Sequence, residues 1–145
     1  MLKLKIDNSA LIEEFFEDSR LLGIVAPLKY YQFTWHVNRA MGYNFRINNN
    51  LEIPVKKKER KYYYPVAEYL VPGMALIHYL YNNQYDGEFL LPEFKHLDFL
   101  WLIKDSEFYD ANLQELIARI KLIPYVQLVS ELSHHKIKNR QNLIL

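Results

Sequence analysis

The sequence contains no cysteine and only 4 glycines, and these two shortages exclude several kinds of chemistry. Without cysteine there is no disulfide, thiol nucleophile, iron–sulfur cluster or cysteine-ligated zinc. Scarce glycine leaves no phosphate-cradling loop, and the Gly-x-Ser-x-Gly and His-Glu-x-x-His motifs of hydrolases do not occur. The sequence therefore favours a non-enzymatic protein, and it indicates no catalytic residue, no cofactor and no metal.

No charge of one sign dominates, and no apolar run is long. The 18 basic residues are balanced by 17 acidic ones, so the chain has no general attraction for nucleic acid or for an anionic membrane. No uninterrupted apolar stretch approaches the roughly 20 residues that span a bilayer, and the N-terminus alternates instead of forming a signal core. We expect a cytoplasmic protein that is not exported and does not contact membranes.

The composition that is present is typical of one globular domain. Half of the residues are hydrophobic and 24% are charged, with 12 Tyr and 8 Phe. A chain of this length buries roughly 68–70% of the surface that its unfolded form exposes. We therefore expect residues 1–145 to form a single domain.

The first third predicts a strand followed by a helix. Leu2, Leu4 and Ile6 alternate with lysines, which is the pattern of a strand with one wet face. After a connector, in which 11–18 forms a loop or short helix, apolar residues recur at helical spacing over 27–41. Pro27 suits the first turn of this helix and Gly42 its C-terminal cap.

The middle of the chain predicts four strands separated by turn residues. They cover 43–48, 51–57, 62–71 and 74–81. Pro65 lies inside the third, and proline cannot donate to a strand ladder. The hairpin over 62–81 is therefore expected at the periphery of the sheet.

The last third predicts strand, helix and strand. Residues 98–103 are apolar on both faces, which is typical of a central strand. The helix has Asp110 as its N-cap and ends at Pro124, with apolar residues at helical spacing: Leu113, Leu116, Ile117 and Ile120. A strand over 125–132 follows, with Val126, Leu128 and Leu132 on one face.

This order of elements predicts an α+β fold. We expect a two-layer sandwich in which an antiparallel sheet of about five to six strands carries two main helices on one face. Right-handed crossovers would place both helices on the same side, as in ferredoxin-like folds, with the middle β-hairpin added to that plan.

Three clusters bear on chemistry. Glu93, His96 and Asp98 could serve as acid, base or metal ligands, but we favour a structural interpretation in which Glu93 holds backbone amides and Asp98 starts a strand. His134 and His135 would point to opposite faces of a strand, so they would share a metal ion only in a loop. The basic run 56–61 beside Tyr62 to Tyr64 could bind nucleic acid. Lysines also protect edge strands from unwanted pairing, and because the net charge is near zero we favour this second role.

One motif resembles a known family. Leu91-Pro92-Glu93, three residues and Leu97-Asp98-Phe99 resemble the signature of the IPExxxVDY family, uncharacterised small bacterial proteins. The Leu-Leu-Gly-Ile segment at 21–24, Pro27-Leu28 and Asn142-Leu143 extend the resemblance over nearly the whole chain. Phe99 stands where the family has Tyr, which implies that this ring packs in the core, and no catalytic residue is transferred.

Together these observations predict a protein-interaction or adaptor module with an unknown protein partner. Tyrosine is abundant between Tyr62 and Tyr85, and it suits interfaces because its ring is apolar and its tip polar. A homodimer through the hairpin edge or an exposed aromatic face is the simplest version. The alternative is a small-molecule-binding regulatory domain of ferredoxin-like type, since 98–132 resembles half of an amino-acid-binding module. An enzyme that uses Glu93, His96 and Asp98 is the third hypothesis.

Overall fold

The computed structural model describes residues 2–57 and 59–145, with the side chains of residues 9–57 and 59–145. The helices are α1 (Leu2–Phe16), α2 (Tyr30–Met41) and α3 (Asp110–Lys121). The strands are β1 (Ser19–Val25), β2 (Arg46–Ile47), β3 (Ile53–Lys57), β4 (Arg60–Tyr64), β5 (Val66–Leu70), β6 (Ile77–Asn82), β7 (Gln84–Tyr85), β8 (Glu88–Phe89), β9 (Phe99–Lys104) and β10 (Leu128–Leu132).

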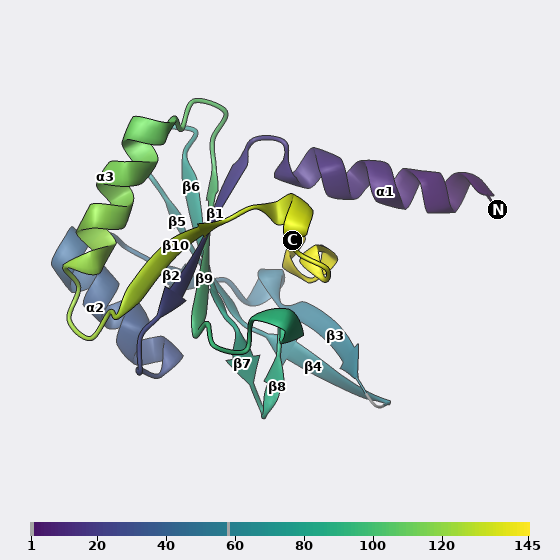
Figure 1. Cartoon of the computed structure of the whole chain (residues 1–145), viewed down its shortest axis with the longest axis horizontal. Helices are drawn as coiled ribbons and strands as arrows, with labels where there is room; N and C mark the ends of the chain where they lie inside the picture. The colour runs from purple at the N-terminus through teal and green to yellow at the C-terminus, as the bar shows by residue number, and fades with distance from the viewer. Residues whose placement is uncertain (1, 58) are drawn as a thin grey trace.

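Six strands form one sheet, in the order β10-β1-β9-β6-β5-β2, and every neighbouring pair is antiparallel (Figure 1). The α+β class and an antiparallel sheet of six strands are therefore confirmed. Strands β3 and β4 form a separate hairpin, and so do β7 and β8. Strand β9 lies between β1 and β6 with all but its last residue buried, as the apolar pattern predicts for a central strand.

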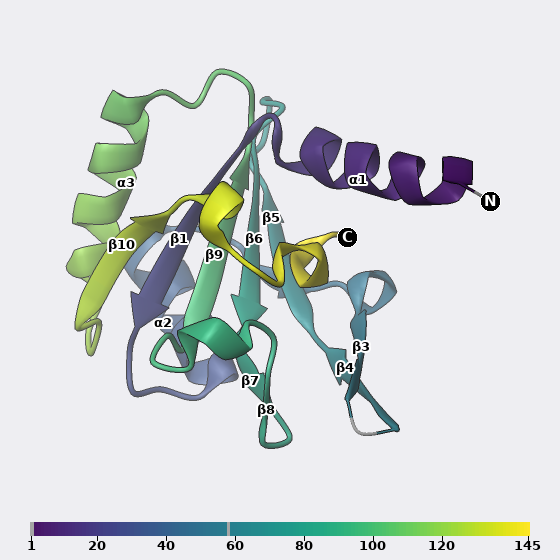
Figure 2. The ribbon, with the colours of Figure 1, turned by 45° about the vertical axis from the view of Figure 1, so that its right-hand side comes forward.

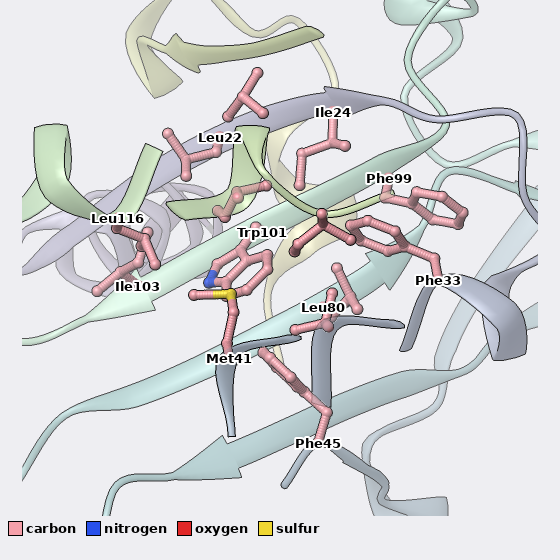
Figure 3. Packing of buried hydrophobic residues seen from close by; sticks show 14 of the residues in the cluster. Leu22, Ile24, Phe33, Met41, Phe45, Leu80, Phe99, Trp101, Ile103 and Leu116 are labelled. Atoms are coloured by element: carbon pink, nitrogen blue, oxygen red, sulfur yellow. The ribbon is translucent and has the colours of Figure 1, made fainter. Parts of the chain in front are cut away.

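Helices α2 and α3 lie along one face of the sheet (Figure 1). The rings of Phe33 in α2 and Phe99 in β9 stack with their centroids 4.4 Å apart. Trp101 is surrounded by Met41, Phe45 and other apolar side chains of the same cluster (Figure 3). The four apolar residues predicted to form the inner stripe of α3 are all buried in this cluster.

The opposite face of the sheet is also covered. Its cluster includes Phe16 at the end of α1, Tyr64 in the β3–β4 hairpin and Leu143 near the C-terminus. The rest of α1 projects away from the body of the molecule (Figures 1 and 2). The covering pieces thus come from three distant segments of the sequence, which a local pattern does not reveal.

The predicted strand at Leu2, Leu4 and Ile6 is wrong, because this segment belongs to α1. Residues 2–16 contain no Gly or Pro and several strong helix formers, which outweigh a short alternation of apolar residues. The first strand is β1, in the segment interpreted as a connector. Leu21, Leu22 and Ile24 are buried on its two faces, so β1 has no alternating pattern to recognise.

The strand predicted over 62–71 is two strands in different sheets. Pro65 separates β4 from β5, because a residue without an N–H interrupts the ladder. The hairpin predicted at the periphery is also wrong, since β6 lies inside the sheet between β5 and β9. The strand predicted over 43–48 is reduced to the two residues of β2.

The C-terminal strand begins later than expected. Tyr125 has a φ of 72°, and β10 starts at Leu128. Leu128 is exposed and Val129 is buried, and Val126, which was predicted on the same strand face as Leu128, lies before the strand begins. Helix α3 begins with Asp110, and its N-cap is Tyr109, whose N–H donates to the side-chain oxygen of Asn112 at 3.0 Å.

Candidate functional site

The signature segment, residues 90–99, is a loop that wraps around one buried side chain. Asn83 is fully buried, and its amide nitrogen donates to the carbonyl oxygens of Phe94 and Leu97 at 2.9 and 2.8 Å. The amide oxygen accepts the N–H of Leu91 at 2.9 Å. Sequence reasoning missed Asn83, although a polar residue directly after an apolar strand was a visible signal.

Glu93 connects this loop to the C-terminal segment. One carboxylate oxygen accepts the backbone N–H of Asn139 at 2.8 Å, and the other accepts its side-chain amide at 2.9 Å. Burial alone would raise the pKa of Glu93, but these hydrogen bonds lower it. Glu93 therefore binds a backbone amide, as expected, and the amide belongs to a segment 46 residues away.

Asp98 closes the end of β1. Its carboxylate accepts the N–H of Ala26 at 2.8 Å, and its own N–H donates to the carbonyl of Ile24 at 2.8 Å. Burial raises the pKa of Asp98, and the hydrogen bond from Ala26 offsets part of that increase. The carboxylate of Asp98 thus binds the backbone just after β1, whereas that of Glu93 binds the C-terminal segment.

The apolar positions of the signature are part of the core. A Cβ atom built on Gly23 would lie 2.6 Å from Cδ1 of Leu97, so glycine leaves room for the leucine. Leu91 and Leu97 are buried, and Phe99 stacks on Phe33. The expectation that these positions serve packing is confirmed.

The structure does not bring Glu93, His96 and Asp98 together as a site. The two carboxylates bind different segments, and His96 is exposed, with its ring 6.1 Å from that of Phe94. Within residues 2–57 and 59–145, no group of three or more His, Asp or Glu side chains is arranged to hold a metal ion.

The tandem histidines lie in a short turn, His134–Lys136, rather than in a strand. The ring of His134 stacks on Phe16 with centroids 4.7 Å apart, and its Nδ1 lies 3.0 Å from a guanidinium nitrogen of Arg140. His134 therefore packs at the end of α1, where its ring helps to cover the second core cluster.

The basic run lies in the β3–β4 hairpin and faces acidic partners. Arg60 pairs with Asp86 at 3.3 Å, and Lys57 pairs with Glu88 at 3.7 Å, both in the neighbouring β7–β8 hairpin. Lys58 lies outside the described residues. Among the tyrosines that follow, Tyr62 and Tyr64 are buried and only Tyr63 is exposed. The aromatic rings that could have stacked on bases are therefore mostly in the core.

A wide cleft of about 1040 Å³ lies between the end of α1 and the ends of β1 and β9. Its two cations are both engaged by carboxylates: Arg20 contacts Glu131 and Asp110 at 2.7 and 2.9 Å, and Lys104 contacts Asp18 at 3.2 Å. The positive charge in this cleft is thus neutralised by carboxylates of the same chain.

Two exposed aromatic residues lie one turn apart on α2. Tyr31, Trp35 and Arg39 follow one another at intervals of four residues on its outward face, and the two rings are 67% and 55% exposed. The guanidinium of Arg39 lies 5.3 Å from the centre of a Trp35 ring. His36 contacts both Trp35 and Tyr125, with centroids 4.9 and 5.7 Å apart. We call Tyr31, Trp35, His36, Arg39 and Tyr125 the aromatic strip.

Two exposed leucines lie three residues before and three residues after Tyr125 in the sequence. Leu122 is 83% exposed at the end of α3, and Leu128 is 45% exposed at the start of β10. The strip was not predicted from the sequence, because the apolar stripe that predicts α2 lies on its inward face. Tyr, Trp and Arg on the opposite side of the same helix were the available signal.

Comparison with protein-family models, with curated proteins and with solved structures found no match. Among the described residues, no helix has both the length and the apolar character needed to cross a membrane.

Proposed function

We propose that this protein is a non-enzymatic interaction module that binds a partner protein through the aromatic strip. The observation that carries the proposal is the exposed series Tyr31, Trp35 and Arg39 on one helix face. Trp, Tyr and Arg are the residues in which the binding energy of protein interfaces concentrates. An exposed surface of this composition is typical of an interaction site.

The strip rests on a rigid base. On the buried side of α2, the hydroxyl of Tyr30 accepts the N–H of Ala67 at 2.8 Å and donates to the carbonyl of Leu80 at 2.5 Å. Phe33 and Val37 on the same side are fully buried. A surface held in this way loses little conformational freedom on binding, which favours affinity.

The chemistry of the strip indicates its partner. Arg39 forms no ion pair in the part of the chain that the structure describes, so a partner carboxylate can bind it. The rings favour aliphatic or aromatic side chains. Strand β10, which follows Tyr125, is a sheet edge of five residues without Pro or Lys, so it also accepts an added strand.

The order of β10, β1, β9 and β6 supports a finer proposal for the fold. Helix α2 follows β1 and α3 follows β9, so these six elements have the order and antiparallel pairing of a ferredoxin-like domain. We propose a two-layer core of that type, with the β3–β4 hairpin added. The signature spacing supports membership of the IPExxxVDY family, and the absence of cysteine supports a place in the bacterial cytoplasm.

Affinity purification from the native host with matched variants tests the function. Trp35→Ala removes the centre of the strip, and Tyr109→Ala removes a ring that is 64% exposed at the other end of α3. We expect one protein to be recovered with wild type and with Tyr109→Ala, and to be lost with Trp35→Ala. Equal recovery with all three forms, or no specific protein at all, would contradict the proposal.

Native mass spectrometry separates a foreign partner from a second copy of this chain. If the partner is a second copy, wild type forms a dimer at micromolar concentration, and Trp35→Ala shifts it to monomer. A dimer that survives Trp35→Ala would assign self-association to another surface.

A further inference from the structure

A smaller hollow lies between α3 and the start of β6, and its lining does not include any residue of the aromatic strip. Its volume is about 140 Å³. Tyr43 and His78 contribute to its lining, and α3 contributes Asn112, Glu115 and Arg119 along one side. Residues three, four and seven apart share a helix face, so α3 presents a polar edge to this cavity.

His78 supplies a hydrogen-bond donor without an acceptor. It is 1% exposed, and its Nδ1 accepts the indole N–H of Trp101 at 2.9 Å. Because an indole N–H only donates, Nδ1 is unprotonated and the proton of the neutral ring is on Nε2. Nε2 has no hydrogen-bond partner within the described residues. Buried polar groups in proteins are nearly always paired, so this donor calls for an acceptor.

The edge of the cavity carries a positive charge without a counterion. Arg119 lies 5.6 Å from the centre of the Tyr43 ring and donates to the carbonyl of Met41 at 3.3 Å. It forms no ion pair within the described part of the chain. Phe108 and Leu116 make the wall apolar. The lining also contains the carboxylate of Glu115, so the donors, the cation and the apolar wall suit the carboxylate end of a small ligand with a short hydrocarbon group.

We propose that this cavity binds a small organic carboxylate, whose oxygens accept from Nε2 of His78 and from Arg119. Its hydrocarbon part lies against Phe108 and Leu116. The cavity is close to the roughly 150 Å³ that holds one benzene molecule, so the ligand has about six non-hydrogen atoms. An α-amino acid would also place its ammonium group near Glu115. The site is separate from the aromatic strip and does not depend on the proposed function.

Entry requires a small movement. Nε2 of His78 lies beneath neighbouring side chains. The rings of Tyr43 and Phe108, centred 5.2 and 6.5 Å from the imidazole, are only half-buried. Side chains at a surface change rotamer within nanoseconds, so either ring can turn aside to admit a ligand.

The two tryptophans of the chain make the test selective. The indole N–H of Trp101 is bonded to His78, whereas Trp35 lies in the aromatic strip and serves as an internal control. Indole ¹H–¹⁵N resonances are recorded during titration with propionate, alanine and sodium chloride. We expect a saturable shift of the Trp101 resonance with propionate, alanine or both, no shift of Trp35, and no response to chloride.

Two surface variants complete the test. Arg119→Gln should weaken binding roughly ten- to hundredfold, because it removes a charge-assisted hydrogen bond. Glu115→Gln should weaken the binding of alanine but not that of propionate, which distinguishes an amino acid from a simple carboxylate. A Trp101 resonance that responds to neither acid, or that responds equally in Arg119→Gln, would overturn the proposal. The N–H of His78 would then contact only the faces of the surrounding aromatic rings.

Discussion

Asn83→Ala should be among the most destabilising single substitutions in this chain. The side chain makes three hydrogen bonds to the backbone of the signature loop, at distances of 2.8 to 2.9 Å. Alanine would leave the carbonyls of Phe94 and Leu97 and the N–H of Leu91 without these partners. The loop that carries Glu93 and Asp98 would lose its central support.

The magnitude follows from the burial of these groups. An unsatisfied buried donor or acceptor costs about 1–3 kcal/mol, and water that enters the space recovers part of that cost. The carbonyl of Phe94 still accepts the N–H of Leu97 at 3.0 Å, so two groups are left unsatisfied. For these two groups we expect the free energy of unfolding to fall by roughly 2–4 kcal/mol. Since a domain is stable by only about 5–15 kcal/mol, the variant should be marginal.

Urea unfolding followed by tryptophan fluorescence measures this loss. Asn82→Ala is the matched control, because Asn82 is the adjacent, half-buried residue and its side chain forms no hydrogen bond among the described residues. We expect that control to lose less than about 1 kcal/mol. If Asn83→Ala were no more destabilising than Asn82→Ala, the signature loop would not depend on the buried amide, and the structural interpretation of the segment would fail.

Three further predictions concern buried groups and use the same unfolding measurement. Tyr64→Phe should be neutral or slightly stabilising, because the buried hydroxyl of Tyr64 has no partner within the described residues. Tyr81→Phe should cost about 1–2 kcal/mol, because the hydroxyl of Tyr81 donates to the carbonyl of Leu143 at 2.7 Å. Equal effects of the two substitutions would refute this difference between the hydroxyls. Burial lowers the pKa of His78 from 6.5 to about 4, so unfolding takes up a proton in this pH range. The free energy of unfolding should therefore fall by up to roughly 3 kcal/mol as the pH falls from 6.5 to 4. His78→Gln should remove this part of the pH dependence. Gly23→Ala should cost about 1–3 kcal/mol through its clash with Leu97, and adding Leu97→Val should recover part of that cost; simple additivity would exclude the contact as the cause.

The elements with a clear period were predictable from the sequence. Helix α3 and the inward face of α2 follow the 3.6-residue repeat, and β9 is a short apolar run between turn signals. Strand β1 was missed because its residues are buried on both faces, and a run without alternation gives no period. At the N-terminus, five alternating residues were too few to distinguish a strand from the helix that forms there.

The residues of the candidate sites were only partly predictable. Glu93 and Asp98 were recognised, but their partners Asn139 and Ala26 lie 46 and 72 residues away and have no local signal. The donor at His78 depends on a cross-strand bond from Trp101, which likewise exists only in the folded chain. Of the aromatic strip, Tyr31, Trp35 and Arg39 were readable on a helical wheel because they recur every four positions, whereas the place of Tyr125 beside His36 exists only in the folded chain.

The most direct test of a protein-binding role for the strip is photo-cross-linking in the native host. A photoreactive phenylalanine analogue replaces Trp35 in one form and Tyr109 in another, and the cross-linked products are identified by mass spectrometry. A protein-interaction module of this geometry should yield one reproducible adduct from position 35 that is absent from position 109. The absence of an adduct at position 35, or the same proteins from both positions, would contradict it.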